Sequence, residues 1–249
     1  MKIVVRGGHC PKVTGAVALI SELTEDRKVK DSVIKYLRLL GQEAIDGTPS
    51  DSTSSSSADL AYGVNKANNC GADLFVSIHF NKAYNSYKGA IGTEVCVYSP
   101  NETAKRVVNG LAGLGFKNRG QKTRKELYEL RNTKMNAMIV EVCFVEATED
   151  VALYKKLGPD AIGKAIAEAI VNKKVQTANT QPASSNAGTG YRVKITADVL
   201  NVRKGAGTNY GVATTVKRNE VYTIVEEKNG WGKLKSGAGY ICLSYTTKL

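Results

Sequence analysis

The sequence contains few of the features that mark membrane or exported proteins. No apolar run approaches the length of a membrane span, so we expect no membrane insertion. Residues 1–6 (MKIVVR) also lack an apolar stretch long enough for a signal peptide. These absences predict a protein without a signal peptide or a membrane-spanning segment.

Cysteine is scarce and follows no metal-binding pattern. The chain has five cysteines, and none of them form a C-x-x-C pair. A structural zinc finger is therefore not expected, while the odd count argues against a disulfide framework and fits a reducing compartment. Cys10 follows His9 directly, which leaves open a cysteine nucleophile, although such a residue would need a base and an orienting group.

The charge is strongly one-sided. The formal net charge is +12, from 35 basic and 23 acidic residues. Residues 191–249 contain 10 Lys/Arg and 4 Asp/Glu, so they carry about half of the excess. Basic proteins often bind nucleic acid, but no segment resembles a nucleic-acid module, and we expect no nucleic-acid partner. Attraction to an anionic surface other than nucleic acid is the interpretation we favour.

Composition divides the chain into three parts. Strand-like and helix-like segments alternate through residues 1–174, which predicts an α/β domain with a twisted sheet and flanking helices. Residues 175–190 are uncharged and have no apolar periodicity, as expected of a flexible linker. Residues 191–249 consist of short β-branched and aromatic runs separated by glycine and asparagine, which indicates a small all-β domain. The sequence leaves the oligomeric state open.

The two histidines both follow apolar runs that are typical of β-strands. His9 ends the run 2–9 (KIVVRGGH), and His79 ends the run 73–79 (DLFVSIH). A third run, 138–141 (MIVE), places Glu141 in the same position. The carboxyl ends of the strands form the ligand-binding edge of an open α/β sheet. Two imidazoles and a carboxylate at this edge predict a metal site.

A third metal ligand is expected from the helix predicted over residues 22–40. Catalytic zinc usually takes three protein ligands and keeps one position open. Glu22 and Asp26 fall within the apolar stripe of this helix, where a carboxylate is costly unless it is paired or bound to a cation. Glu22 lies in the first turn, nearest the sheet edge, and is the better candidate, whereas Asp26 is expected to bond to a ligand or a loop. A solvated first-turn Glu22, favoured by the helix dipole, remains the alternative.

Two further segments carry polar residues of interest. Glu94 alternates with the apolar residues of a probable strand, 92–98; a solvated strand face is the expected position, and an approach to the substrate is the alternative. Residues 49–57 are rich in serine and are expected to form a polar loop after the second strand.

Several of these motifs together resemble a known family, the zinc-dependent N-acetylmuramoyl-L-alanine amidases of the amidase 3 type. The resemblance covers residues 1–174 and is closest to the versions found in phage endolysins. The segments that match the family in order and spacing are Gly8-His9, Glu22 with Asp26, Val29, Val33 and Gly41, the run 77–81, and Val140-Glu141. The runs 118–120 and 127–130 resemble the endolysin versions in particular.

The resemblance implies a site and a chemistry. It implies that His9, Glu22 and His79 bind zinc and that Glu141 is the catalytic acid/base. Zinc lowers the pKa of bound water to about 7, and a carboxylate that is not a ligand then takes the proton and passes it to the leaving amine. Phe80 and Lys82 depart from the small residues common around this histidine in the family.

The C-terminal segment resembles a second family. The runs 200–203, 205–210, 229–234 and 239–241 resemble, in order, a bacterial SH3-type domain that binds cell walls. The resemblance implies a small SH3-like barrel that recognises peptidoglycan peptides or cross-bridges. The basic charge of the chain then fits attraction to the anionic wall of a Gram-positive bacterium.

These features predict a peptidoglycan hydrolase that cuts the amide bond between N-acetylmuramic acid and L-alanine. A phage endolysin would wait in the host cytoplasm and act on the wall after release; a sporulation-type autolysin would have a similar sequence. Two other functions stay open. One is a zinc peptidase that cuts within the stem peptide, and the other is a wall-binding protein with an inactive first domain.

Overall fold

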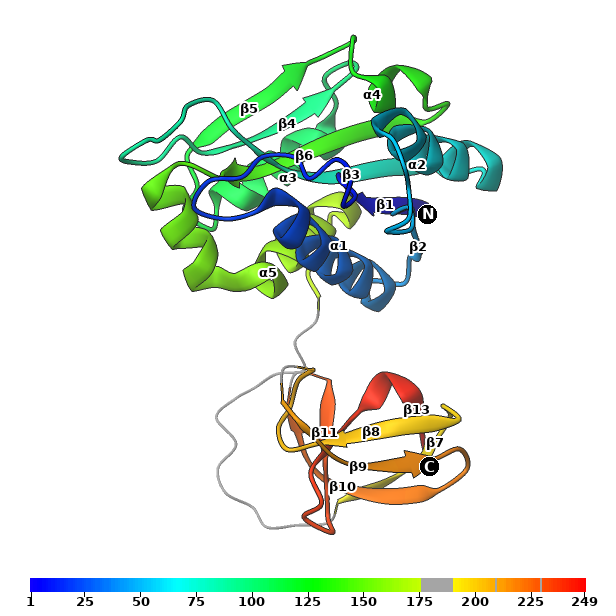
Figure 1. Ribbon diagram of the computed structural model, residues 1–249. Helices are drawn as coiled ribbons and strands as arrows, with labels where there is room; N and C mark the ends of the chain where they lie inside the picture. The colour runs from blue at the N-terminus through cyan, green and yellow to red at the C-terminus, as the bar shows by residue number, and fades with distance from the viewer. Residues whose placement is uncertain (176–189, 209, 229) are drawn as a thin grey trace. The chain divides into compact units, whose positions relative to one another are not determined.

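The computed structural model describes residues 1–175, 190–208, 210–228 and 230–249. The predicted linker, 175–190, lies outside these residues except for its two end positions. The chain divides into two compact units, Met1–Ala178 and Asn179–Leu249 (Figure 1). None of the helices in the described part is long and apolar enough to span a membrane.

A six-stranded mixed sheet forms the centre of the first unit. In spatial order its strands are β2 (Glu43–Asp46), β1 (Lys2–Gly7), β3 (Leu74–Asn81), β6 (Asn136–Phe144), β4 (Thr93–Val97) and β5 (Asn118–Thr123). The first four strands are parallel to one another, whereas β4 runs antiparallel to β6 and parallel to β5. Both strands that carry the predicted sheet-edge residues, β3 and β6, therefore lie in the middle of the sheet.

Helices cover both faces of this sheet (Figure 1). One face packs against α1 (Glu22–Leu39), α3 (Glu102–Ala112) and α5 (Thr148–Val171). The other face packs against α2 (Ser56–Cys70) and the short α4 (Tyr128–Asn132). This arrangement confirms the predicted α/β class with flanking helices.

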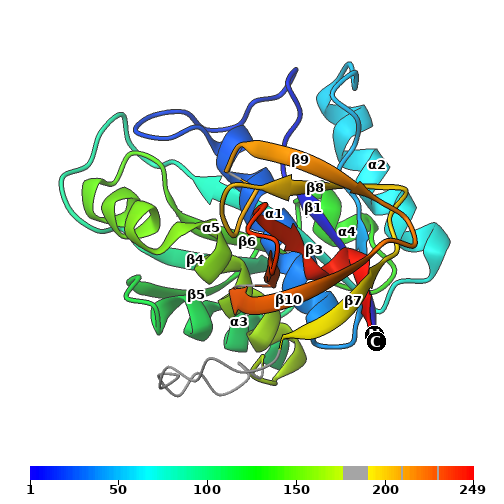
Figure 2. The same ribbon diagram turned by 90° about the horizontal axis from the view of Figure 1, so that it is seen from below.

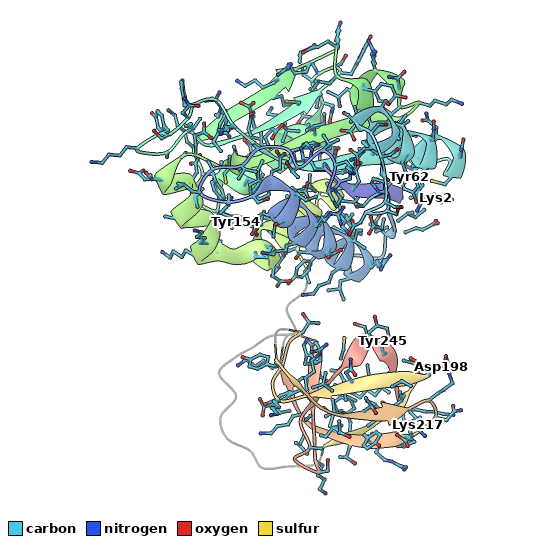
Figure 3. All side chains as sticks on the ribbon, viewed as in Figure 1. Lys2, Tyr62, Tyr154, Asp198, Lys217 and Tyr245 are labelled. Atoms are coloured by element: carbon cyan, nitrogen blue, oxygen red, sulfur yellow. The ribbon has the colours of Figure 1, made fainter. Side chains whose placement is uncertain are left out.

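Two segments differ from their predicted bounds. The apolar residues Ile162, Ile166 and Ile170 repeat at helical spacing and predict a helix near residues 160–174, whereas α5 begins at Thr148 and bends at Gly158, whose φ is 75°. Its first half contains Tyr154, which is labelled in Figure 3. Tyr154 packs edge-to-face on Phe80 and donates a hydrogen bond to Glu25 Oε2 at 2.7 Å. The end of the serine-rich run is helical, because the Ser55 side chain caps α2 by accepting from the amide of Ala58.

The second unit is an antiparallel sheet of seven strands, which confirms the predicted all-β domain. Figure 2 shows β8 beside β9 and β7 beside β10, as their pairing registers require. Alternate inward residues such as Val193, Ile195 and Ile224 form its core. The elements are β7 (Tyr191–Ile195), β8 (Val199–Arg203), β9 (Val212–Lys217), β10 (Val221–Lys228), β11 (Trp231–Leu234), β12 (Tyr240–Cys242), a 3-10 turn at Leu243–Tyr245 and β13 (Thr246–Lys248).

Candidate metal centre

Polar side chains collect on one face of the sheet, near the carboxyl ends of its central strands. Val4, Phe75 and Ile139 belong to the core beneath α2 and α4. Successive strand residues point to opposite faces, so residues two positions further along point to this same face. On β1, β3 and β6 these residues are Arg6, Ser77 with His79, and Glu141.

The structure brings His9, Glu22 and His79 together. His9 follows β1, Glu22 is the first residue of α1, and His79 lies near the end of β3. The Oε1 atom of Glu22 lies 3.1 Å from His9 Nε2 and 3.1 Å from His79 Nδ1. One potential ligand atom from each of the three residues lies within 4.8 Å of the other two. Glu22 is only 3% exposed, so it is not a solvated first-turn acid.

Backbone groups and glycines hold this cluster in place. Glu22 Oε1 accepts from the amide of Phe80 at 2.9 Å, and Oε2 accepts from the amide of Ala16 at 2.6 Å. A Cβ atom on Gly8 would lie 2.1 Å from His79 Cε1. One on Gly15, whose φ is +69°, would lie 2.4 Å from Glu22 Oε2. Both positions therefore require glycine.

The electrostatics of the cluster favour a cation. Burial raises the pKa of Glu22, but hydrogen bonds from His79 and His9 outweigh it, so this pKa lies well below its ordinary value. Burial lowers the pKa of His79, but Glu129 and Glu22 outweigh it and raise this pKa well above its ordinary value. Positive charge is thus stabilised between an anionic carboxylate and two imidazoles. Two imidazole nitrogens and one carboxylate oxygen are a donor set that suits catalytic zinc.

Glu141 lies next to this cluster without belonging to it. It is the register partner of His79 in the β3–β6 ladder. Its Oε2 atom is shielded from solvent and has no hydrogen-bond partner in the described part of the chain. Burial raises the pKa of Glu141 to about 7, even though His79 lowers it. A carboxylate that titrates near neutrality can both accept and donate a proton.

Asp26, one turn along α1 from Glu22, is fully buried. The sequence predicts a hydrogen bond from Asp26 to a ligand or a loop, but neither carboxylate oxygen has a partner among the residues described. Burial raises the pKa of Asp26 to about 8. Asp26 is therefore largely protonated and neutral at pH 7.

The prediction for Glu94 is wrong. Glu94 is 5% exposed, receives a hydrogen bond from Arg119 Nε at 2.7 Å and another from Asn81 Nδ2 at 3.2 Å, and lies opposite Glu141. The reason is topological: β4 lies between β6 and β5, so its carboxylate faces the interior of the fold. A local alternation pattern does not reveal which strands become internal.

A network of buried ion pairs next to His79 was not selected from the sequence: it consists of Arg6, Asp59 and Glu129, each at most 2% exposed. Burial raises the pKa of Glu129, but hydrogen bonding to His79 and the charge of Arg6 lower it below its ordinary value. The position of Arg6 inside the apolar run 2–9 was the one sequence feature that could have indicated a buried charge. Asp59 and Glu129 lie on helices and carry no comparable signal.

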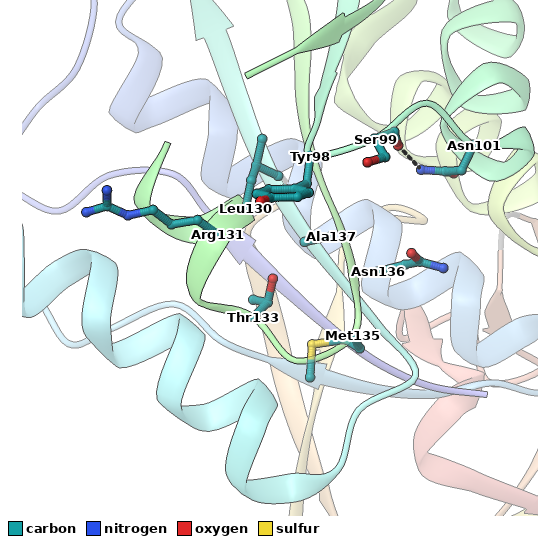
Figure 4. Close-up of a pocket in the computed structure, with 9 residues that line it drawn as sticks. All are labelled: Tyr98, Ser99, Asn101, Leu130, Arg131, Thr133, Met135, Asn136 and Ala137. Atoms are coloured by element: carbon teal, nitrogen blue, oxygen red, sulfur yellow. Dashed lines mark hydrogen bonds between the residues drawn. The ribbon is translucent and has the colours of Figure 1, made fainter. Parts of the chain in front are cut away.

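A cavity of about 220 Å³ lies elsewhere on this face (Figure 4). It is lined by the residues that follow β4, by α4 and by the start of β6, including Tyr98, Arg131 and Asn136. Glu141 is five residues further along β6, toward its other end. The cavity contains none of the four predicted site residues.

Comparison with known proteins agrees with this geometry. Residues 3–172 match the N-acetylmuramoyl-L-alanine amidase family, and residues 198–245 match the bacterial SH3 domain family. The catalytic domain of the CD27L endolysin targeting Clostridia difficile is similar in structure, with a TM-score of 0.64 and 30% identity. That match covers 70% of this chain and 98% of the endolysin domain.

Curated relatives extend the comparison. An uncharacterized protein of Clostridium perfringens is 50% identical over 181 residues, which is 71% of this chain. The chain spans about half the length of that relative, 53%. The N-acetylmuramoyl-L-alanine amidase CwlM of Bacillus licheniformis is 31% identical over 204 residues, 79% of this chain and 75% of CwlM. The chain belongs to the N-acetylmuramoyl-L-alanine amidase family and carries a C-terminal bacterial SH3 domain.

Proposed function

We propose that the protein hydrolyses the amide bond between N-acetylmuramic acid and L-alanine in the peptidoglycan of a Gram-positive cell wall. The observation that carries the proposal is the convergence of His9, Glu22 and His79, with Glu141 in register beside His79. Family membership supports this choice of bond, and the site provides residues suited to cutting it.

In this proposal His9 Nε2, Glu22 Oε1 and His79 Nδ1 hold a zinc ion. Zinc, when bound, supplies an acidified water and polarises the scissile carbonyl. Glu141 takes the proton from the attacking water and delivers it to the amine of L-alanine as the carbon–nitrogen bond breaks. Its pKa near 7 suits both transfers, because the carboxylate must be basic enough to accept the proton and acidic enough to release it.

The SH3 domain and the positive charge suit a role in wall attachment. The proposal assigns residues 1–174 to catalysis, 175–190 to a linker and 191–249 to binding of peptidoglycan. Similarity to an endolysin catalytic domain supports a phage enzyme that waits in the host cytoplasm and acts at the wall after release.

Product analysis tests the proposed bond. Purified wall is digested with the full-length protein, and new amino termini and reducing sugar ends are counted. We expect new L-alanine amino termini and a constant number of reducing ends, with no products from the His79→Ala variant. New amino termini from residues further along the stem peptide would identify a peptidase instead. No products from the wild-type protein would favour a wall-binding protein.

A further inference from the structure

A chain of buried polar groups extends from His79 away from the candidate zinc ligands. His79 Nε2 lies 3.0 Å from Ser77 Oγ, and Ser77 Oγ lies 3.3 Å from Glu129 Oε1. The other carboxylate oxygen of Glu129 lies 3.8 Å from His79 Nε2. Ser77 is 0% exposed and Glu129 is 2% exposed, so water does not compete for these contacts.

Arg6 fixes the charge at the far end of this chain. It is fully buried, with Nη1 3.1 Å from Glu129 Oε1 and Nη2 2.8 Å from Asp59 Oδ2. Its remaining N–H groups donate to the backbone carbonyls of Gly7, Gly8 and Asp59. Four of the five N–H groups of the guanidinium therefore donate hydrogen bonds, and its contact with Glu129 is an ion pair. A carboxylate paired with this fixed cation stays ionised, so Glu129 can only accept hydrogen bonds.

Because the Glu129 carboxylate can only accept, it sets the direction of the two hydrogen bonds that link it to Ser77 and to His79. The Ser77 hydroxyl must donate its proton to Glu129, which leaves the lone pairs of Ser77 Oγ to accept from His79. His79 therefore keeps a proton on Nε2. When a metal ion replaces the second ring proton, the ring atom that can bind it is Nδ1, which faces Glu22 Oε1 at 3.1 Å. Adjacent strand geometry supports this alignment, because Ser77 and His79 point to the same face of β3.

We infer that Arg6, Glu129 and Ser77 form a directional hydrogen-bond relay that fixes His79 in the tautomer and orientation required to bind a metal through Nδ1. The inference rests on the proposed function, since it assigns the relay to the proposed zinc site. Ser77 and Glu129 are positioning residues. Outer-shell partners of this kind typically change metal affinity by about 10–100-fold when they are removed.

Zinc affinity of the full-length protein, measured by competition with a chromogenic chelator, tests the relay. Glu129→Gln replaces an acceptor with a group that can also donate to Ser77 Oγ, so the relay can reverse and place the proton on Nδ1. We expect zinc affinity about 10–100-fold below that of wild type. Glu126→Gln is the matched control, because Glu126 lies close in sequence but its side chain is 62% exposed.

A second pair of variants separates positioning from folding. Ser77→Ala removes the bridging hydroxyl and leaves the ion pairs of Arg6 in place. It therefore still tests whether the relay affects zinc affinity if Glu129→Gln unfolds. We expect weaker zinc binding by Ser77→Ala and recovery in Ser77→Thr, which restores a hydroxyl. Thermal unfolding of the zinc-free proteins checks that Ser77→Ala is folded.

The tautomer itself can be observed. With only two histidines in the chain, proton–nitrogen spectra of the imidazole rings contain few signals. Zinc-loaded wild type should show His79 protonated at Nε2, and this signal should weaken in Glu129→Gln and Ser77→Ala. Wild-type zinc affinity in both variants, with Nε2 still protonated, would overturn the relay alone. A wild-type protein that binds no zinc would overturn the proposed function and the relay together.

Discussion

Glu141 illustrates how a single position in a strand acquires a chemical role. It has no hydrogen-bond partner for Oε2 among the described residues, and its environment raises its pKa into the neutral range. Among the described residues, Glu141 forms no ion pair that would depend on its charge. A substitution that keeps its shape should therefore leave the fold intact.

We expect Glu141→Gln to retain zinc and stability but to lose activity. Removal of a general acid/base typically costs about 10²–10⁴-fold in rate. Initial rates on solubilised peptidoglycan, with zinc content measured on the same samples, check this expectation. Activity close to wild type would assign proton transfer to another residue, and the neighbouring Glu94 would be the first to examine.

Gly8 provides a steric test of the same site. A Cβ atom there would lie 2.1 Å from His79 Cε1, well inside van der Waals contact, so Gly8→Ala should push the imidazole away from Glu22. We expect sharply reduced zinc content with most of the secondary structure retained. Gly113→Ala is the control, because its added methyl would meet only backbone oxygens at 3.4 Å. Equal zinc content in both variants would show that His79 is not a required ligand.

At the scale of whole elements, α1 and α5 are joined by Asp160. Its carboxylate accepts from Lys35 Nζ at 2.7 Å, from the Tyr36 hydroxyl at 2.6 Å and from the Ser32 hydroxyl at 3.2 Å. Partial burial raises the pKa of Asp160, but hydrogen bonds from Lys35 and Tyr36 outweigh it and lower the pKa below its ordinary value of 3.8.

A depressed pKa in the folded state makes this contribution depend on pH. The ionised Asp160 stabilises the fold above the unfolded-state pKa, and the effect is lost as pH falls through the lower folded-state pKa. Asp160→Asn should therefore destabilise the protein by roughly 0.5–1 kcal/mol near pH 7, as expected for a partly exposed group. The difference should shrink below about pH 4. Urea unfolding at several pH values measures it, and a pH-independent difference would contradict the prediction.

Elements defined by local periodicity were predictable, and those defined by long-range pairing were not. The helix predicted at residues 22–40 matches α1, because its apolar residues repeat at helical spacing and Val29, Val33 and Leu37 are fully buried. The end-of-strand pattern pointed to His9 and His79, which lie together with Glu22 in the structure. The internal position of β4, and with it the burial of Glu94, depends on strand order. Two of the relay residues, Arg6 on β1 and Glu129 on α4, come from elements that no local pattern links to β3.

At the scale of the whole molecule, catalysis and attachment are assigned to separate parts of the chain. Residues 1–175 alone should fold and still hydrolyse solubilised peptidoglycan fragments, because the proposed site lies entirely within them. The same fragment should act more slowly on intact wall, since attachment raises the local concentration of enzyme without changing its active site. Hydrolysis rates of this fragment and of the full-length protein, measured on solubilised fragments and on intact wall, check the prediction. Equal loss on soluble and intact substrates would show that the SH3 domain supports folding or catalysis directly.

Residues 190–249 alone should bind purified wall without cutting it. Their excess of basic residues predicts binding that weakens as salt is added, because added ions screen exposed charges. Sedimentation with wall fragments at increasing salt measures this effect. An absence of binding at every salt concentration would remove the targeting role from this domain.

The dispersed origin of the three candidate ligands has a thermodynamic consequence. His9, Glu22 and His79 come from separate elements, and an unfolded chain would not hold them together. Zinc at this site would bind the native state selectively and raise the free energy of unfolding through mass action, by about 2.7 kcal/mol when free zinc is a hundredfold above its dissociation constant. Calorimetry should then show a chelator-sensitive transition for the amidase unit and an unaffected one for the SH3 domain. Metal supply would thereby set how long the enzyme survives heat and proteases, as well as how fast it works.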